Sequence, residues 1–214
     1  MSLVARGLLC EYGAMTYSTS DLKQALYSER ESAFYRNRGG YPIALAGAIW
    51  WGALGAAGLL LRSHGQWVML AFVTSGAIFP LAVLLARLFR VDFMRDRTAV
   101  TDLLLPAFTS MFLFWPIAIS AFWTYPQLVP LVLGVGMSIL WPVVGWTYGR
   151  TALYTTHAVV RAIICFVLWN WVPSSRFTGL PFAISGIYLA TVCVIFIASS
   201  TFYQTSAQDV VAGQ

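Results

Sequence analysis

Residues 41–61 read YPIALAGAIWWGALGAAGLLL, an uninterrupted stretch without a charged side chain. Because an α-helix rises about 1.5 Å per residue, a run of about 20 apolar residues is long enough to cross the hydrocarbon core of a bilayer. Small residues recur at every fourth position of this run, at Ala44, Ala48, Gly52 and Ala56. This spacing favours the close approach of a second helix. The stretch therefore predicts a transmembrane helix with one face packed against a neighbour.

Five further apolar runs of comparable length follow in the chain. They cover approximately residues 67–88, 99–123, 128–147, 154–172 and 181–202. The connections between them are short, so consecutive helices are expected to pack as antiparallel hairpins. The predicted fold class is an all-α membrane protein with six transmembrane helices, preceded by a short amphipathic helix.

The composition agrees with this fold class. Hydrophobic residues make up 59% of the 214 residues and charged residues only 10%, whereas soluble domains contain about 25% charged residues. A chain of this length has no room for a separate soluble domain once the six runs are placed. We therefore expect a cytoplasmic N-terminal region over residues 1–40, a transmembrane domain over 41–202 and a cytoplasmic tail over 203–214.

The basic residues predict the orientation of the bundle. Cytoplasmic loops of membrane proteins carry an excess of Lys and Arg. Ten basic residues lie before the first run or in the turns after the second and fourth runs, and the opposite side holds only Arg62 and Arg176. The ten are Arg6, Lys23, Arg30, Arg36, Arg38, Arg87, Arg90, Arg95, Arg97 and Arg150. Both termini are therefore expected in the cytoplasm, and the net charge of +5 indicates topology rather than nucleic-acid binding.

The segment before residue 41 predicts the amphipathic helix. Ser18 followed three residues later by Asp21 is typical of a helix start, and Gly39 with Gly40 ends the pattern. An apolar stripe lies between them, formed by Leu22, Ala25, Leu26 and Ala33. We expect this helix to lie on the inner leaflet or against the cytoplasmic helix ends. Residues 1–14 match no pattern and precede Met15, which indicates either a later translation start or a disordered tail.

Prolines occur inside three of the predicted spans, at Pro80, at Pro106 with Pro116, and at Pro142. Proline lacks an N–H and clashes with the carbonyl four residues earlier, so it kinks a helix. We therefore expect the second, third and fourth spans to bend. Broken helices line substrate sites in many transporters, and they are also common in membrane helices without such a role.

The fifth run contains TTHAVVRAII, residues 155–164, which places His157 and Arg161 inside the membrane. A charge near the bilayer centre costs about 2.5–3.5 kcal/mol on insertion scales. With a rise of about 1.5 Å per residue, Arg161 is expected roughly 11–15 Å below the cytoplasmic boundary, close to the midplane. Tyr154, His157 and Arg161 are three or four residues apart and therefore share one helix face.

Asp102 is the acid that the sequence offers as a partner for Arg161, since it begins the third run on the same side of the membrane. An acid in the first turn of a helix is also favoured by the helix dipole alone. Tyr188 and Ser138, on other runs, are expected at a similar depth to Arg161. The predicted polar centre consists of Arg161, His157, Asp102, Tyr188, Tyr154 and Ser138.

Three functions fit this centre. In the first, the protein is a small transporter or ligand-binding membrane protein whose Arg161 binds the anionic group of a small or amphipathic ligand. In the second, it is a structural or accessory subunit, in a homo-oligomer or a larger membrane complex, and the centre only fixes helix packing. In the third, Ser138 and His157 form an intramembrane hydrolase dyad, although Ile139 stands where the G-x-S-G turn of rhomboid-type proteases has glycine.

Other chemistry finds little support in the sequence. Cys10, Cys165 and Cys193 are widely spaced, and no zinc, P-loop or HExxH motif occurs. His64 and His157 are expected at different depths, which argues against a haem with two histidine ligands. We therefore expect no metal and no cofactor, and the lipid bilayer is the expected partner.

One segment carries a family resemblance. FPLAVLLARLFRVDF, residues 79–93, joins an apolar PLA sequence to basic residues and then to VD at a turn. It resembles a family of small bacterial integral membrane proteins whose domain has no known function. The similarity extends loosely over residues 20–202 and implies a six-span protein of the bacterial inner membrane. It implies no activity; Asp92 belongs to the resembling pattern, and helix capping or pairing with Arg90 or Arg95 accounts for it.

Overall fold

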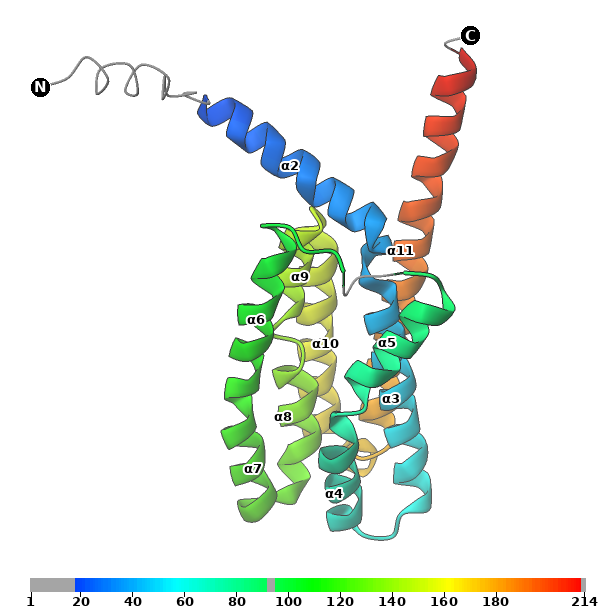
Figure 1. Cartoon of the computed structure of the whole chain (residues 1–214). Helices are drawn as coiled ribbons and strands as arrows, with labels where there is room; N and C mark the ends of the chain where they lie inside the picture. The colour runs from blue at the N-terminus through cyan, green and yellow to red at the C-terminus, as the bar shows by residue number, and fades with distance from the viewer. Residues whose placement is uncertain (1–17, 92–94, 213–214) are drawn as a thin grey trace, which may run out of the picture.

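A computed structural model describes residues 18–91 and 95–212 of the chain (Figure 1). Regular secondary structure in these residues is helical throughout, which confirms the predicted all-α fold. Cys10, Asp92 and residues 1–14 lie outside the described part, so the predictions for them are not addressed by the structure. The helices are α2 (Thr19–Arg36), α3 (Tyr41–Leu60), α4 (His64–Ser75), α5 (Ile78–Leu88), α6 (Leu104–Met111), α7 (Trp115–Thr124), α8 (Val129–Gly136), α9 (Trp141–Thr147), α10 (Thr151–Trp171) and α11 (Gly179–Ala212).

Five helical segments of the described chain are long and apolar enough to cross a membrane. They are Arg38–Leu60, Thr101–Thr124, Pro126–Thr147, Thr151–Trp171 and Gly179–Ser199. The remaining predicted span is divided into α4 and α5, which are bent by 51° relative to each other, so a sixth crossing exists if this pair acts as one span. The chain reverses direction between successive apolar segments and continues through the breaks within them, and α2 and the end of α11 extend from the same end of the bundle (Figure 1).

Three of the apolar segments are interrupted next to a proline, and at Pro80 the interruption is the predicted bend, between α4 and α5. Pro80 stands in the first turn of α5, directly after the break between α4 and α5. Pro116 and Pro142 are each the second residue of a helix, α7 and α9, that follows an interruption. The interruption before α7 is the 3₁₀ turn Phe112–Phe114. A proline fits in the first turn of a helix because the N–H group that it lacks would have no partner within the helix there. Each interruption therefore places its proline in the first turn of the following helix rather than in a helix interior.

Helix α3 packs along the whole of the membrane part of α11. A Cβ atom added at Gly47 would lie 2.8 Å from the Tyr188 ring, and one at Gly55 would lie 2.8 Å from the Phe182 ring. Ser185 of α11 donates a hydrogen bond of 2.8 Å to the carbonyl oxygen of Ala48. The absence of side chains at these glycines therefore brings the two backbones together.

The face used by α3 differs in part from the predicted one. Ala44 and Ala48 are buried, as expected, but Ala56 is exposed, and Gly58 instead meets Phe177 and Thr178, directly before α11. A step of four residues advances about 40° beyond one helical turn, so a four-residue pattern rotates out of a straight interface within three steps. Beyond Ala48, the closest contacts of the α3 glycines are made at Gly55 and Gly58.

Helix α2 begins with the predicted capping box, formed by Ser18 and Asp21. Its second half is held against the bundle: the Arg30 guanidinium lies 4.6 Å from the centre of the Trp146 ring, and Arg36 Nε donates to Asp96 at 3.2 Å. Its first half extends away from the bundle and leaves Leu22 exposed (Figure 1). At the other end of the chain, α11 continues to Ala212, so residues 203–212 are helical where a tail was expected.

Candidate functional site

Arg161 stands at the middle of the 21-residue helix α10. Its side chain is fully buried, and the side chains of Tyr154, His157 and Cys165 on the same face are also buried. Val159 and Ile163 on the opposite face are 50% and 56% exposed. Helix α10 therefore turns its polar stripe into the bundle. The charge of Arg161 lies in the protein interior rather than in lipid.

The Arg161 guanidinium is only partly satisfied. Nη1 donates a hydrogen bond of 2.6 Å to the hydroxyl oxygen of Tyr188 on α11. The guanidinium carbon lies 5.0 Å from the centre of the Tyr188 ring and 5.3 Å from that of Trp51 on α3, close enough for cation–π attraction. Nε and Nη2 are buried and have no hydrogen-bond partner in the described chain.

His157 lies beside this guanidinium and is held by α11. Its Nδ1 is 2.7 Å from the hydroxyl oxygen of Thr191. That hydroxyl donates its own hydrogen to the carbonyl oxygen of Ile187 at 2.9 Å, so Nδ1 is the donor to Thr191 and the neutral ring leaves Nε2 as an acceptor. Nε2 is buried without a partner among the described residues. The ring centre is 4.7 Å from that of Trp141 and 4.8 Å from that of Tyr188.

Asp102 does not join this cluster. Its side chain is exposed, and among the side chains that the structure describes, those of residues 18–91 and 95–199, no carboxylate forms an ion pair with Arg161. Asp102 is the second residue of its span, so at about 1.5 Å per residue it lies on the order of 13 Å nearer the membrane boundary than Arg161. In addition, α9 packs against both α6 and α10. The ion pair expected between Asp102 and Arg161 is therefore not formed.

The other two predicted residues lie near the cluster but bind elsewhere. Tyr154 donates to the carbonyl oxygen of Gly39, at the turn between α2 and α3, where φ is +62°. Its ring stacks on Trp141, with centres 5.6 Å apart. The Ser138 hydroxyl donates to the carbonyl oxygen of Val135 at 2.6 Å, inside the break between α8 and α9. In the described part of the chain, the Ser138 hydroxyl and the His157 ring have different hydrogen-bond partners, so the two do not form a hydrolase dyad.

Two aromatic residues of the site were not predicted. Trp51 faces the Arg161 guanidinium, and Trp141 covers His157. Trp51 lies three residues after Ala48 and therefore on the small-residue face that predicts helix contact. That phase relation could have identified Trp51 as a bundle residue.

Among the described residues, no group of three or more His, Cys, Asp or Glu could hold a metal ion.

Two adjoining cavities lie on the other side of Tyr188 and Trp141. The smaller, of about 90 Å³, has these two rings in its wall together with Gly47 and Tyr148. The larger, of about 400 Å³, lies between the break in α4–α5 and helices α6 and α7. The two share five lining residues and therefore adjoin each other: Ile43, Ile78, Phe108, Met111 and Met137.

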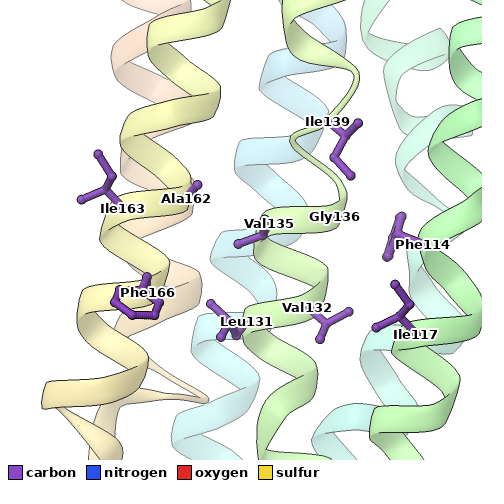
Figure 2. Close-up of a pocket in the computed structure, with 10 residues that line it drawn as sticks. All are labelled: Phe114, Ile117, Leu131, Val132, Val135, Gly136, Ile139, Ala162, Ile163 and Phe166. Atoms are coloured by element: carbon purple, nitrogen blue, oxygen red, sulfur yellow. The ribbon is translucent and has the colours of Figure 1, made fainter.

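A separate groove of about 620 Å³ lies on the outer surface between α7, α8 and α10. Figure 2 shows its lining side chains, which include Ile117, Leu131 and Phe166 and which contain only carbon. Ile163, on the exposed face of α10, also lines it. The groove offers no group that could bind a polar ligand, and it differs in this respect from the space that reaches Tyr188.

The chain was compared with protein families, curated proteins and solved structures. The model of the family of unknown function DUF7010 matches residues 26–198, from the middle of α2 to the end of the apolar part of α11. No curated protein and no solved structure matches the chain. The match covers most of the chain, including Arg161, His157 and the cavities, and it agrees with the resemblance of residues 79–93 to an uncharacterised family. The chain therefore belongs to the family of unknown function DUF7010.

Proposed function

We propose that this membrane protein binds a small anion in the middle of its helical bundle, as a transporter or ligand-binding protein with Arg161 as the anion receptor. The observation that carries the proposal is the unpartnered pair Nε and Nη2 of a fully buried guanidinium. These two nitrogens form one edge of the guanidinium, and their N–H bonds point in parallel. This is the edge that binds a carboxylate or a phosphate through two hydrogen bonds.

The electrostatics of the bundle support an external anion. Arginine stays charged in proteins, and an uncompensated charge in a low-dielectric interior costs several kcal/mol. Cation–π contacts with Trp51 and Tyr188 offset part of this cost, but the described residues supply no carboxylate to Arg161. A bound anion would neutralise the charge and satisfy both nitrogens.

The neighbouring side chains suit the same ligand. The Tyr188 hydroxyl, already bonded to Nη1, can turn its hydrogen toward an anionic oxygen. His157 Nε2 accepts a hydrogen bond when the ring is neutral, so it can bind a protonated oxygen of a phosphate or a carboxylic acid. The hydrogen bond from Nδ1 to Thr191 fixes the ring in this orientation.

Anion binding by purified protein in phosphatidylcholine nanodiscs tests this proposal, with acetate and inorganic phosphate as probes in titration calorimetry. Arg161→Lys is expected to lower the affinity for the anion that binds at least tenfold, because an ammonium group cannot form the two parallel bonds. Arg161→Gln is expected to abolish binding. Arg62→Gln, which removes an exposed charge at one end of the bundle, is the matched control and should bind as the unmodified protein does. Equal affinities in Arg161→Gln and the unmodified protein would refute the role of Arg161.

We also propose that both termini face the cytoplasm of a bacterial cell and that the protein lies in the inner membrane. The end of the bundle that carries α2 exposes several arginines, namely Arg38, Arg87, Arg90 and Arg97. The opposite end has Arg62 and Arg176, and Arg176 is engaged with Gln127 at 2.8 Å. This asymmetry supports the orientation because positively charged loops are retained on the cytoplasmic side.

Cysteine labelling in intact cells tests the orientation. In a background without native cysteines, Ser63→Cys at the α3–α4 turn is expected to react with a membrane-impermeant maleimide. Lys23→Cys on α2 is the counterpart on the other side and should react only after the inner membrane is permeabilised. The reverse labelling pattern would invert the proposed topology.

A further inference from the structure

We infer that the ligand of Arg161 is an amphipathic anion whose apolar chain occupies the two adjoining cavities, a statement that rests on the proposed function. Its charged group would lie at Arg161, and its chain would pass the Tyr188 and Trp141 rings toward the break between α4 and α5. The chemical class is a monoanionic carboxylate or phosphate that carries at least one alkyl chain.

The first support is the position of the rings between the charge and the space. Tyr188 contacts Arg161 through its hydroxyl and the smaller cavity through its ring. Trp141 contacts His157 and lines the same cavity. The centres of the Trp141 and Tyr188 rings are 5.6 Å apart. These two side chains thus separate the unpartnered nitrogens from the cavity, and their displacement would join the two.

The second support is the chemistry of the larger cavity. Its volume of about 400 Å³ falls within the range of roughly 300–1,000 Å³ that is typical of ligand pockets. Its side chains are hydrocarbon or thioether except for the indole of Trp115 and the hydroxyl of Ser75, which donates to the carbonyl oxygen of Phe72 at 2.8 Å. The space therefore accepts hydrocarbon, and no charged side chain lines it.

The third support is the route that the cavity provides. Phe79, Leu105 and Phe112 line it and are 51%, 73% and 57% exposed. In a membrane these faces meet lipid chains, so an amphiphile can enter from the bilayer between α5 and α6. The groove in Figure 2 does not lead to the rings beside Arg161 and His157, because neither Tyr188 nor Trp141 lines it.

Gly76 gives a direct test of the chain position. It lies at the α4–α5 break and lines the larger cavity, and a Cβ atom added there would meet nothing within 4 Å. Gly76→Leu is therefore expected to fill part of the cavity without a clash. Gly186 on α11 also has nothing within 4 Å and lines neither cavity, so Gly186→Leu is the matched control.

The experiment compares the affinities of both variants and the unmodified protein for acetate and dodecanoate in phosphatidylcholine nanodiscs. Because the bilayer is the same in each sample, partitioning of dodecanoate into lipid cancels in the ratio of two affinities. Gly76→Leu is expected to lower the dodecanoate affinity at least tenfold and to leave the acetate affinity within twofold, whereas Gly186→Leu should change neither. Acetate binding with a dodecanoate affinity insensitive to Gly76→Leu would overturn this inference alone. If Arg161→Gln still bound both acetate and dodecanoate, the proposed function would be overturned.

A second measurement needs no cavity variant. Dodecanoate with a diazirine near the end of its chain is photolysed with the unmodified protein, and the attached residues are mapped by mass spectrometry. Attachment to Phe79, Leu105 or Phe112 is the expected result. Attachment confined to the groove residues Ile117, Leu131 and Phe166 would overturn the inference.

The same chemistry could come from a free amphiphile or from an anionic membrane lipid. Lipids extracted from protein purified from its membrane distinguish these sources. An anionic lipid present with the unmodified protein and depleted in Arg161→Gln would identify a membrane lipid as the ligand. Equal anionic lipid in both samples, with dodecanoate binding that requires Arg161, would identify a free amphiphile.

Discussion

Replacement of Arg161 by methionine is expected to raise the free energy of unfolding of the ligand-free protein by about 1–4 kcal/mol, the range observed when buried ionic groups are replaced by apolar ones of similar volume. The substitution removes a charge that has no carboxylate partner in the described chain, and methionine keeps most of the volume between Trp51 and Tyr188. The same variant should bind no anion. A gain in stability with a loss of binding is typical of a residue that is kept for function.

Thermal unfolding in nanodiscs, without added anion, measures this effect. For a domain of this size, 1 kcal/mol corresponds to a shift of about 2–4 °C in Tm. Removal of the arginine also leaves the Tyr188 hydroxyl without its partner, so Arg161→Met combined with Tyr188→Phe should be at least as stable as Arg161→Met alone. Arg176→Met is the control, because Arg176 donates to Gln127 and to the carbonyl oxygen of Trp169 and should lose rather than gain stability. A large loss of stability in Arg161→Met would instead assign Arg161 to helix packing, as in a structural or accessory subunit.

Gly58→Ala is expected to lower the free energy of unfolding by about 3 kcal/mol, at the upper end of the usual cost of overpacking. A Cβ atom at this position would lie 2.0 Å from the backbone carbonyl oxygen of Phe177. A backbone oxygen cannot rotate away as a side chain can. The end of α3 and the turn that leads into α11 would therefore have to separate, and the contact between α3 and α11 would loosen.

Two other glycines separate this clash from the general effect of alanine in a helix. At Gly52 the added Cβ atom lies 3.3 Å from the Ser185 hydroxyl, and at Gly186 it meets nothing within 4 Å. Gly52→Ala is expected to have a small effect, and Gly186→Ala to be neutral or to gain up to about 1 kcal/mol from the lower chain entropy of alanine. The loss of Tm should follow the order Gly58, Gly52, Gly186. Equal values in the three variants would show that the α3–α11 spacing does not limit stability.

The spans were predictable because hydropathy over about 20 residues is a strong signal. The break between α4 and α5 was predictable only as a bend at Pro80, since a sequence gives the lost hydrogen bond but not the angle at which neighbouring helices hold the two pieces. The continuation of α11 to Ala212 was not predicted, because residues 203–212 are no longer apolar and hydropathy measures burial in lipid rather than helicity.

In the candidate site, the features that depend on one helix could be predicted, and those that depend on the packing of several helices could not. Helical phase placed Tyr154, His157 and Arg161 on one face, because that relation depends on α10 alone. The partner of the charge could not be obtained in this way, since it depends on which helices are neighbours and at what depth. Asp102 was selected as the acid available in a span, but it lies nearer the boundary, and α9 packs between α6 and α10. The contact between Arg161 and Trp51 requires α3 to approach α10, which no local pattern specifies.

The breaks described above divide the bundle into a stiff part and a part with hinges. α3, α10 and the membrane part of α11 are unbroken, and they carry Trp51, Arg161 and Tyr188. The remaining apolar segments are interrupted, and two of them, α4–α5 and α6–α7, form most of the wall of the larger cavity. Helix interruptions next to prolines are places where a bundle can bend without breaking further hydrogen bonds. The charge of Arg161 therefore lies in the stiff part of the bundle, whereas most of the wall of the larger cavity belongs to the part with hinges.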